Sequence, residues 1–470
     1  MRQAGRGWHD PADERGGERR GVSAASPPQP VSLAAAAWLW LRIGCLSFGG
    51  PAGQIALLHR EVVEERRWVS DARFLHALNV CTLLPGPEAT QLATYLGWLL
   101  HGVPGGLAAG LLFLLPGALV MLGLSALYIG FGEVPAIAGL FYGLQCAVLV
   151  LVVEALLRLA RRTLAGPPAL AVALGAFLAL AFFGLPFPLV VLAAGLVGLL
   201  WPAGFLADHG RAAKPGPPVL LDLLLAAEPD RIARAAGPAR RAGLLALLLW
   251  LLPVVLLAGH PPWGDLAWFF AKLAVVTFGG AYAVLAYAAQ QAVEQHHWLS
   301  AAQMLAGLGL AETTPGPLIL VLQFIGTLAG HAAAGLLGGL AGAALTLWVT
   351  FLPCFAWIFL AAPHAEQLHE AARLRGALAA VTAALVGVIA SLALWFGLRV
   401  LFGALREVTL GPLRLELPLA ASLDPVAALL VLLAAVCLLR MRVPMLRSLA
   451  LTALAGMVLR LAFGWLLGRP

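Results

Sequence analysis

The sequence predicts an all-α polytopic membrane protein with about 13 transmembrane segments in two homologous repeats. Hydrophobic residues make up 61% of the 470-residue chain and charged residues 11%, whereas soluble domains are about 45–50% apolar and about 25% charged. Apolar runs of about 20 residues, the length of a membrane helix, recur along the chain. Two short motifs also recur at one fixed offset, which indicates an internal repeat.

The apolar runs form two groups on either side of a polar interval, with six runs before it and seven after it. The interval, residues 207–241, is basic and rich in proline, as is typical of a linker. The runs cover residues 31–50, 74–101, 104–130, 134–157, 168–184, 186–206, 242–259, 266–283, 304–330, 333–362, 376–404, 426–439 and 445–467.

This grouping predicts five regions. Residues 1–30 contain arginines and prolines but no compact apolar stretch, so we expect a disordered cytoplasmic tail and not a signal peptide. An N-terminal repeat is predicted at 31–206, followed by the basic linker at 207–241. An unpaired transmembrane helix at 242–259 then precedes a C-terminal repeat at 260–470.

The distribution of basic residues predicts the orientation in the membrane. Arginine and lysine are concentrated in the tail, the linker and alternate loops, which favours a cytoplasmic N-terminus and an outer C-terminus. Segment 54–73 is an exception, because it carries four arginines on the nominal outside.

The internal repeat has an offset of 230 residues. Of the 40 positions from 48 to 87, 14 are identical to their counterparts from 278 to 317, including a tryptophan and a glutamate. The motifs are Phe48-Gly49-Gly50 with Phe278-Gly279-Gly280, and Pro85-Gly86-Pro87 with Pro315-Gly316-Pro317. The chain is therefore a duplication.

The number of spans predicts that the two repeats have inverted topology, because seven spans precede the second copy. Inverted repeats are a transporter architecture whose substrate site lies near the midplane and is built from broken helices. Glycine and proline supply such breaks. Each motif alone is also compatible with a tight turn or a packing kink. Recurrence favours a functional break, because exposed N–H groups and positive helix ends suit an anion.

The same offset carries Arg42 onto Lys272, and each cation lies six residues before its Phe-Gly-Gly motif. A buried cation is costly unless it is paired or faces water. An inverted duplication brings two such cations towards one central site, where a tetrahedral dianion can use both. The alternative is that the long side chains extend to the membrane interface.

Four further residues are candidates for charge coupling. Glu88 follows the first Pro-Gly-Pro motif, Glu312 precedes the second, and His76 and His101 lie in the first broken segment. A carboxyl group in a low-dielectric site binds a proton more readily than in water, so Glu88 and Glu312 are the candidates for proton coupling. The alternative is a carboxylate that faces a vestibule or pairs with arginine, and for the histidines we favour a structural role.

Several classes of function are disfavoured. The basic residues do not form the clustered footprint of a nucleic-acid binder. No P-loop, dinucleotide fingerprint or CxxC pair is present, which argues against an ATP-driven pump or a membrane-embedded enzyme. His296 and His297 are adjacent, diverge on a helix and lack accompanying ligands, so we expect no metal and no cofactor. A membrane scaffold is the remaining alternative, but it leaves the duplicated breaks unexplained.

The motifs resemble the chromate ion transporter family, long two-domain type. In the first copy the resemblance is carried by FGGPAGQ at 48–54, RRWVS at 66–70 and LLPGPEATQLATYLGW at 83–98. In the second copy it is carried by TFGGAYAV at 277–284, HWLS at 297–300 and ETTPGPLILVLQFIG at 312–326.

The resemblance implies export of chromate from the bacterial cytoplasm across the inner membrane, driven by the proton motive force, and hence chromate resistance. Sulfate is the expected competitor, and a sulfate or other oxyanion carrier, even for uptake, is the alternative. A monomer and a homodimer are both compatible with two repeats in one chain. The copies differ where Ala281 replaces Pro51 and Leu318 replaces Glu88, so one half is expected to bind while the other couples.

Overall fold

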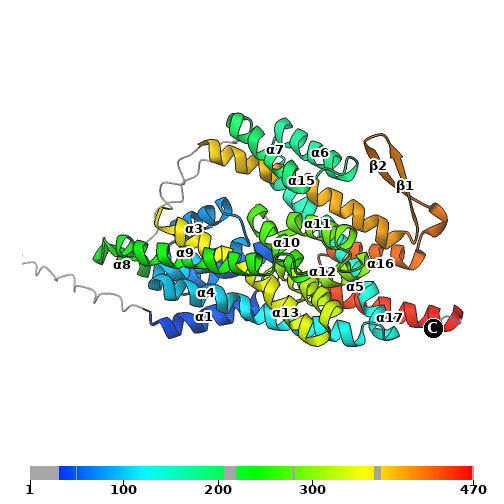
Figure 1. Ribbon diagram of the computed structural model, residues 1–470, viewed down its shortest axis with the longest axis horizontal. Helices are drawn as coiled ribbons and strands as arrows, with labels where there is room; N and C mark the ends of the chain where they lie inside the picture. The colour runs from blue at the N-terminus through cyan, green and yellow to red at the C-terminus, as the bar shows by residue number, and fades with distance from the viewer. Residues whose placement is uncertain (1–30, 49, 206–218, 278–280, 365–371, 468–470) are drawn as a thin grey trace, which may run out of the picture.

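A computed structural model describes residues 31–48, 50–205, 219–277, 281–364 and 372–467, which are almost entirely helical (Figure 1). Among them, six helices are long and apolar enough to cross a membrane, and four shorter helices are also apolar. These helices support a multi-pass membrane protein. The count of 13 spans and the inversion of the repeats are not confirmed and stay predictions.

The first repeat consists of eight main helices, of which η1 is a π-helix. Their bounds are α1 (Leu33–Leu46), α2 (Gly50–His59), η1 (Arg60–Glu65), α3 (Asp71–Leu83), α4 (Glu88–Phe131), α5 (Pro135–Thr163), α6 (Pro167–Ala181) and α7 (Phe187–Leu200), followed by the short 3-10 helix η2 (Pro202–Gly204).

The interval predicted as a linker is partly helical. It contains α8 (Leu220–Ala227) and the first residues of α9 (Arg231–Leu256). The predicted unpaired helix at 242–259 is thus the second half of a longer helix. Alanine and arginine, which are good helix formers, make up most of its basic first part.

The second repeat follows the same order and adds a β-hairpin between α15 and α16. Its elements are α10 (Trp263–Val276), α11 (Ala281–Gln290), the π-helix η3 (Gln291–Gln295), α12 (Ala301–Thr313), η4 (Leu318–Leu320), α13 (Val321–Ala361), η5 (Ala362–His364), α15 (Ala372–Leu401), β1 (Leu405–Leu410), β2 (Leu413–Pro418), η6 (Ala420–Ser422), α16 (Pro425–Ala435), η7 (Val436–Arg440) and α17 (Met445–Leu467).

Helix α4 folds back on itself. His101 and Gly102 leave the helical region, and Gly102 has a φ of 64° that favours glycine. The short arm (88–100) and the long arm (103–131) then pack so closely that a Cβ on Gly97 would overlap the carbonyl oxygen of Gly105. Two glycines therefore permit a tight helical hairpin.

Helix α13 repeats this hairpin in the second copy. Ala334 and Gly335 form the turn, with a φ of 62° at Gly335. A Cβ on Gly330 would overlap the carbonyl oxygen of Gly338. We call residues 321–333 the short arm and 336–361 the long arm of α13.

The segment around the first Pro-Gly-Pro motif also reverses. Arg73 near the start of α3 pairs with Asp222 of α8 (Nε to Oδ1, 2.5 Å), and Arg231 of α9 donates to the carbonyl of Leu100 at 2.6 Å. A straight helix over about 28 residues would separate its ends by about 42 Å, yet both ends of this one lie at α8 and the start of α9. The apolar run 74–101 is therefore two half-length helices and not one span.

The chain also reverses between α1 and η1, between α10 and Trp298, and between α12 and the short arm of α13. In the first copy, Arg42 of α1 reaches Glu61 of η1 at 3.7 Å. In the second copy, the rings of Phe269 in α10 and Trp298 after η3 lie 5.7 Å apart. A Cβ on Gly307 of α12 would overlap the ring of Phe324 in the short arm of α13.

The reversals of the chain determine where the basic segment 54–73 lies. This segment is the exception in the distribution of basic residues. Its end lies against α8, because Leu221 N donates to the carbonyl of Trp68 at 3.0 Å. The start of α1 lies at this end too, because His101 Nε2 lies 2.7 Å from the carbonyl oxygen of Val31. The arginines of this segment thus lie at the same end of the molecule as the start of the basic helix α9.

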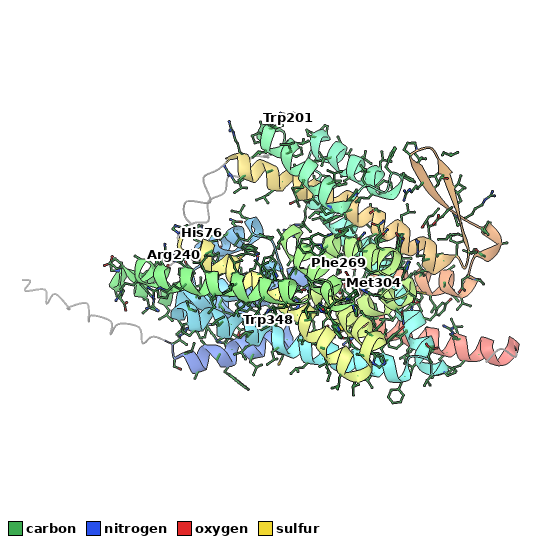
Figure 2. The ribbon with its side chains drawn as sticks, viewed as in Figure 1. His76, Trp201, Arg240, Phe269, Met304 and Trp348 are labelled. Atoms are coloured by element: carbon green, nitrogen blue, oxygen red, sulfur yellow. The ribbon has the colours of Figure 1, made fainter. Side chains whose placement is uncertain are left out.

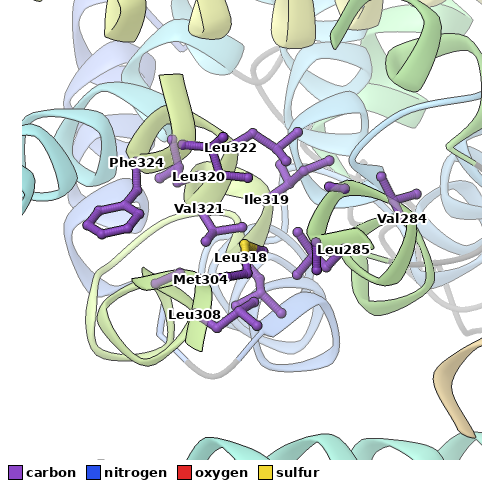
Figure 3. Close-up of a cluster of buried hydrophobic side chains, with 14 of the residues drawn as sticks. Val284, Leu285, Met304, Leu308, Leu318, Ile319, Leu320, Val321, Leu322 and Phe324 are labelled. Carbon is purple, nitrogen blue, oxygen red and sulfur yellow. The ribbon is translucent and has the colours of Figure 1, made fainter. Parts of the chain in front are cut away.

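The outer helices of the two repeats pack in a reciprocal arrangement. Helix α17 of the second copy packs along α5 of the first, whereas α15 of the second packs along α6 and α7 of the first (Figure 1). Leucines and valines of α11, α12, η4 and α13 form the centre of the main apolar core (Figure 3). This core fixes the second Pro-Gly-Pro motif between α12 and η4.

Candidate functional site

The four chain breaks meet at the centre of the molecule through two equivalent hydrogen bonds. Gly86 N of the first Pro-Gly-Pro motif donates to the carbonyl of Thr277 at 2.7 Å, and Gly316 N of the second donates to the carbonyl of Ser47 at 2.8 Å. Ser47 and Thr277 end the helices before the Phe-Gly-Gly motifs. Donors and acceptors are both related by the offset of 230, so each copy closes on the other.

The glycines of these motifs are required by their backbone. Gly86 has a φ of 128° and Gly316 a φ of 93°, a region that side chains disfavour. A Cβ on Gly86 would also lie 2.8 Å from Gln91 Nε2 and 3.0 Å from Cys354 Sγ. Glycine is therefore the residue that allows the close approach of the two copies.

Gln54 joins the two copies as well, although sequence reasoning missed it. Its buried side chain donates from Nε2 to the carbonyl of Gly316 at 2.5 Å. The equivalent position in the second copy is Val284, so this contact exists once. The sequence feature that could have indicated this residue is a single amide side chain among the small and apolar residues after Phe-Gly-Gly.

A small cavity of about 20 Å³ lies at this junction, enough for about one water molecule. Residues from the starts of α2, α4 and η4 line it, so the N-terminal ends of three helices border one space. Its lining consists of Pro51, Gln54, Gly86, Pro87, Glu88, Ala89, Thr277, Pro317, Leu318 and Ile319.

Three side-chain oxygen atoms in the segments around the breaks lack protein partners. Ser47, Thr90 and Gln91 are fully buried, and their Oγ, Oγ1 and Oε1 atoms have no hydrogen-bond partner among the described residues. Buried polar groups in native proteins are almost always bonded to protein, water or ligand. The junction therefore offers unused polar atoms together with helix N-termini, which is chemistry suited to a hydrated anion.

The two candidate cations do not line the cavity. The side chain of Arg42 is 48% exposed and pairs with buried Glu61, which also bonds Arg66. The ammonium of Lys272 lies 5.7 Å from the centre of the Tyr287 ring. Each lies about one helical turn before its break.

The two candidate acids lie in different surroundings. Glu88 begins α4 and lines the cavity. Glu312 is 5% exposed, lies in α12 outside the cavity lining, and accepts a hydrogen bond from Tyr282 at 2.5 Å. The equivalents of Glu312 and Tyr282 in the first copy are Thr82 and Ala52, so this buried pair belongs to the second copy alone.

The remaining predicted site residues are placed as follows. Pro85 and Pro87 are half-buried, whereas Pro315 and Pro317 are buried. Phe48 is exposed, and Gly50 has a φ of 70°. Gly49, Phe278, Gly279 and Gly280 lie outside the described residues.

The histidines lie in separate surroundings. His296 stacks on Trp298 with ring centres 4.2 Å apart, whereas His297 Nδ1 lies 2.9 Å from the carbonyl oxygen of Val293. His76 lies towards one end of the molecule and away from Phe269 and Met304 in the middle (Figure 2). The structural role favoured for His76 and His101 stays a prediction.

Comparison with known proteins identifies the family of this chain. The profile of the chromate transporter family matches residues 34–199 and 264–459, one stretch in each repeat. The chain belongs to the chromate transporter family. The matched stretches contain all four motifs, Arg42, Lys272, Glu88 and Glu312.

Relatives within the family carry the same kind of name. The chain is 35% identical to a chromate transport protein of Pseudomonas aeruginosa, over 77% of this chain and 80% of the relative. It is 30% identical to a chromate transport protein of Cupriavidus metallidurans CH34, over 74% and 79%. A probable chromate transport protein of Synechococcus elongatus is 26% identical over 75% and 81%. No solved structure matches the chain significantly.

Proposed function

We propose that this protein is a secondary transporter that exports chromate from the bacterial cytoplasm through the junction of its four chain breaks. The observation that carries the proposal is the reciprocal pair of hydrogen bonds that joins each Pro-Gly-Pro motif to the other copy's Phe-Gly-Gly break. Membership of the chromate transporter family supports the substrate. Export is expected to confer chromate resistance.

The junction is suited to a tetrahedral dianion. Helix N-termini bind oxyanions through backbone N–H groups and their positive dipole ends, and three of them line the cavity. The unpartnered atoms of Ser47, Thr90 and Gln91 add hydrogen-bonding capacity. Arg42 and Lys272 each lie about one helical turn before a break, and we infer that they add positive potential there.

Transport requires the junction to open. The cavity of about 20 Å³ is too small for an anion with four oxygen atoms. We infer that the repeats are inverted across the membrane and that the two reciprocal contacts open in turn. Breaking the bond at Gly86 exposes the site to one side, and breaking the bond at Gly316 exposes it to the other. In this model the Gln54 contact, which exists on one side only, biases the two openings unequally.

The proton motive force has two components that favour export in different ways. A membrane potential that is negative inside favours exit of a dianion by about 2.3 kcal/mol per charge per 100 mV. The pH gradient drives export only if a group in the transport pathway binds and releases protons. Glu88 in the cavity lining and buried Glu312 are the residues that we propose for this role.

The direct test is accumulation of labelled chromate in energised everted membrane vesicles that contain this protein. We expect uptake that an uncoupler abolishes. Valinomycin with potassium removes the membrane potential, and nigericin removes the pH gradient. The two treatments therefore separate the contributions of the potential and of the pH gradient to uptake. No uptake by correctly inserted protein would contradict export of chromate. Strong inhibition by sulfate would identify a broader oxyanion carrier.

Substitutions separate binding from coupling. Arg42→Ala with Lys272→Ala is expected to lower both exchange of labelled for unlabelled chromate and energised uptake by about tenfold or more. Glu312→Gln is expected to preserve exchange and to lower the uptake driven by the pH gradient. Glu407→Gln on β1 is the matched control. Parent-like uptake in both variants would contradict these assignments.

A further inference from the structure

A second cavity lies at one end of the molecule, away from the central junction. It has a volume of about 300 Å³, within the range of pockets that hold organic ligands. Its walls are the end of the short arm of α4, the residue after α8 and the first turn of α9. The lining consists of Trp98, Leu99, Gly102, Glu228, Arg231, Ile232, Arg234 and Ala235.

The polar part of this cavity is cationic. Arg231 and Arg234 outnumber the one acid, Glu228, which pairs with both at 3.9 Å and 2.5 Å. Arginine has five N–H donors, and these contacts leave several of them unused. Asp230, the N-cap of α9, makes no side-chain capping bond, so the first turn of α9 has no capping side chain for its N–H groups.

A buried donor at the cavity also lacks a partner. Trp98 is 2% exposed, and its indole N–H has no hydrogen-bond partner among the described residues. Buried indole N–H groups usually find a partner. This N–H has almost no accessible surface and does not open onto the cavity. The groups of the cavity that suit a phosphate-bearing anion are therefore the two guanidinium groups beside the start of α9.

The other part of the cavity is apolar and continues onto a lipid-facing helix. Leu99, Ile232 and Ala235 contribute hydrocarbon to the lining. Beyond its first turns, α9 exposes Leu245, Leu252 and Leu256 by 47–65%. Helix periodicity places these leucines on the face that carries Arg234, as expected of a face in contact with acyl chains. Arg240 lies on the same helix near this end of the molecule (Figure 2).

We propose that this cavity binds the headgroup of an anionic phospholipid, with its acyl chains along the exposed face of α9. Basic pockets at helix ends near the membrane surface are suited to such headgroups. A free oxyanion would use the same cations but not the apolar lining or the leucines of α9. Because Arg231 also bonds the carbonyl of Leu100, a bound headgroup fixes the end of the short arm of α4.

The test is native mass spectrometry of the purified full-length protein with phosphatidylglycerol or phosphatidylcholine at equal concentration. We expect preferential retention of phosphatidylglycerol. Removing one cation with Arg234→Gln is expected to lower that preference about fivefold, and Arg231→Gln with Arg234→Gln about 20-fold or more. Arg406→Gln on β1 is the control.

Arg234 is 66% exposed, so its substitution tests the site without threatening the fold. Equal retention of the two lipids by the parent protein would overturn the proposal. An unchanged preference in the double variant, or an equal loss in the Arg406 control, would also overturn it. Displacement of phosphatidylglycerol by excess inorganic phosphate would assign the cavity to a free oxyanion instead. The readout does not depend on transport, so it stands apart from the proposed export of chromate.

Discussion

At the scale of residues, the two central glycines determine how closely the repeats approach. Gly86 and Gly316 have positive φ angles, and their N–H groups carry the reciprocal bonds. We expect Gly86→Ala and Gly316→Ala each to lower stability by roughly 1–2 kcal/mol and to reduce chromate uptake. Gly123→Ala is the matched control, because a Cβ there meets nothing within 4 Å. Unfolding midpoints and vesicle uptake measure the effect, and parent-like values for Gly86→Ala would contradict it.

Gln54 allows a second prediction at this scale. Gln54→Leu leaves the carbonyl of Gly316 without its buried side-chain donor, at a cost of about 1–3 kcal/mol. We expect correct insertion but roughly tenfold slower transport, because the opening that this contact opposes becomes favoured and the protein returns less often to the other state. Gln145→Leu is the control, since Gln145 makes the same type of bond at an exposed position. If both variants transport equally well, Gln54 has no special role.

The sequence places Arg42 and Lys272 at equivalent positions but does not reveal their partners. The partner of Arg42 is Glu61, 19 residues further on, and it is reached only because the chain reverses at the Phe-Gly-Gly break. At the equivalent position the second copy has Gln291. Long-range contacts of this kind depend on the fold, whereas the spacing of motifs depends on sequence alone.

At the scale of elements, the sequence predicts the apolar runs and their breaks but not the reversals. A run of about 28 apolar residues fits one tilted span or two half-length helices equally well by length. The distinction comes from close contacts across the break within a run, such as that between Gly307 and the ring of Phe324. Neither helix propensity nor hydropathy describes contacts between two helical segments.

The hairpin of α13 therefore depends on its small residues. The Cβ of a valine at position 330 would lie 2.1 Å from the carbonyl oxygen of Gly338. This is a steric clash, so the two arms would have to separate. Overpacking of this kind costs about 1–3 kcal/mol or more. We expect Gly330→Val to lower the yield of folded protein in size-exclusion chromatography. Gly123→Val, with the same change on an open helix face, should match the parent, and an equal loss in both variants would indicate a general effect of valine.

At the scale of the whole molecule, the two repeats are interlocked and not merely adjacent. Helix α17 of the second repeat packs along α5 of the first, and α15 packs along α6 and α7. A Cβ on Gly143 of α5 would overlap the carbonyl oxygen of Thr452 in α17. When one repeat is alone, its outer helices therefore lack the helices of the other repeat against which they pack.

Interlocking predicts the behaviour of a divided chain. We expect fragments 1–210 and 211–470 to co-purify and to transport chromate when expressed together, and each fragment to be unstable when expressed alone. Gly143→Leu in the first fragment should abolish co-purification, because the side chain fills the space that α17 occupies. Gly123→Leu should preserve it. Stable single fragments, or co-purification that survives Gly143→Leu, would show that the central junction alone holds the repeats together and that the outer helices add little.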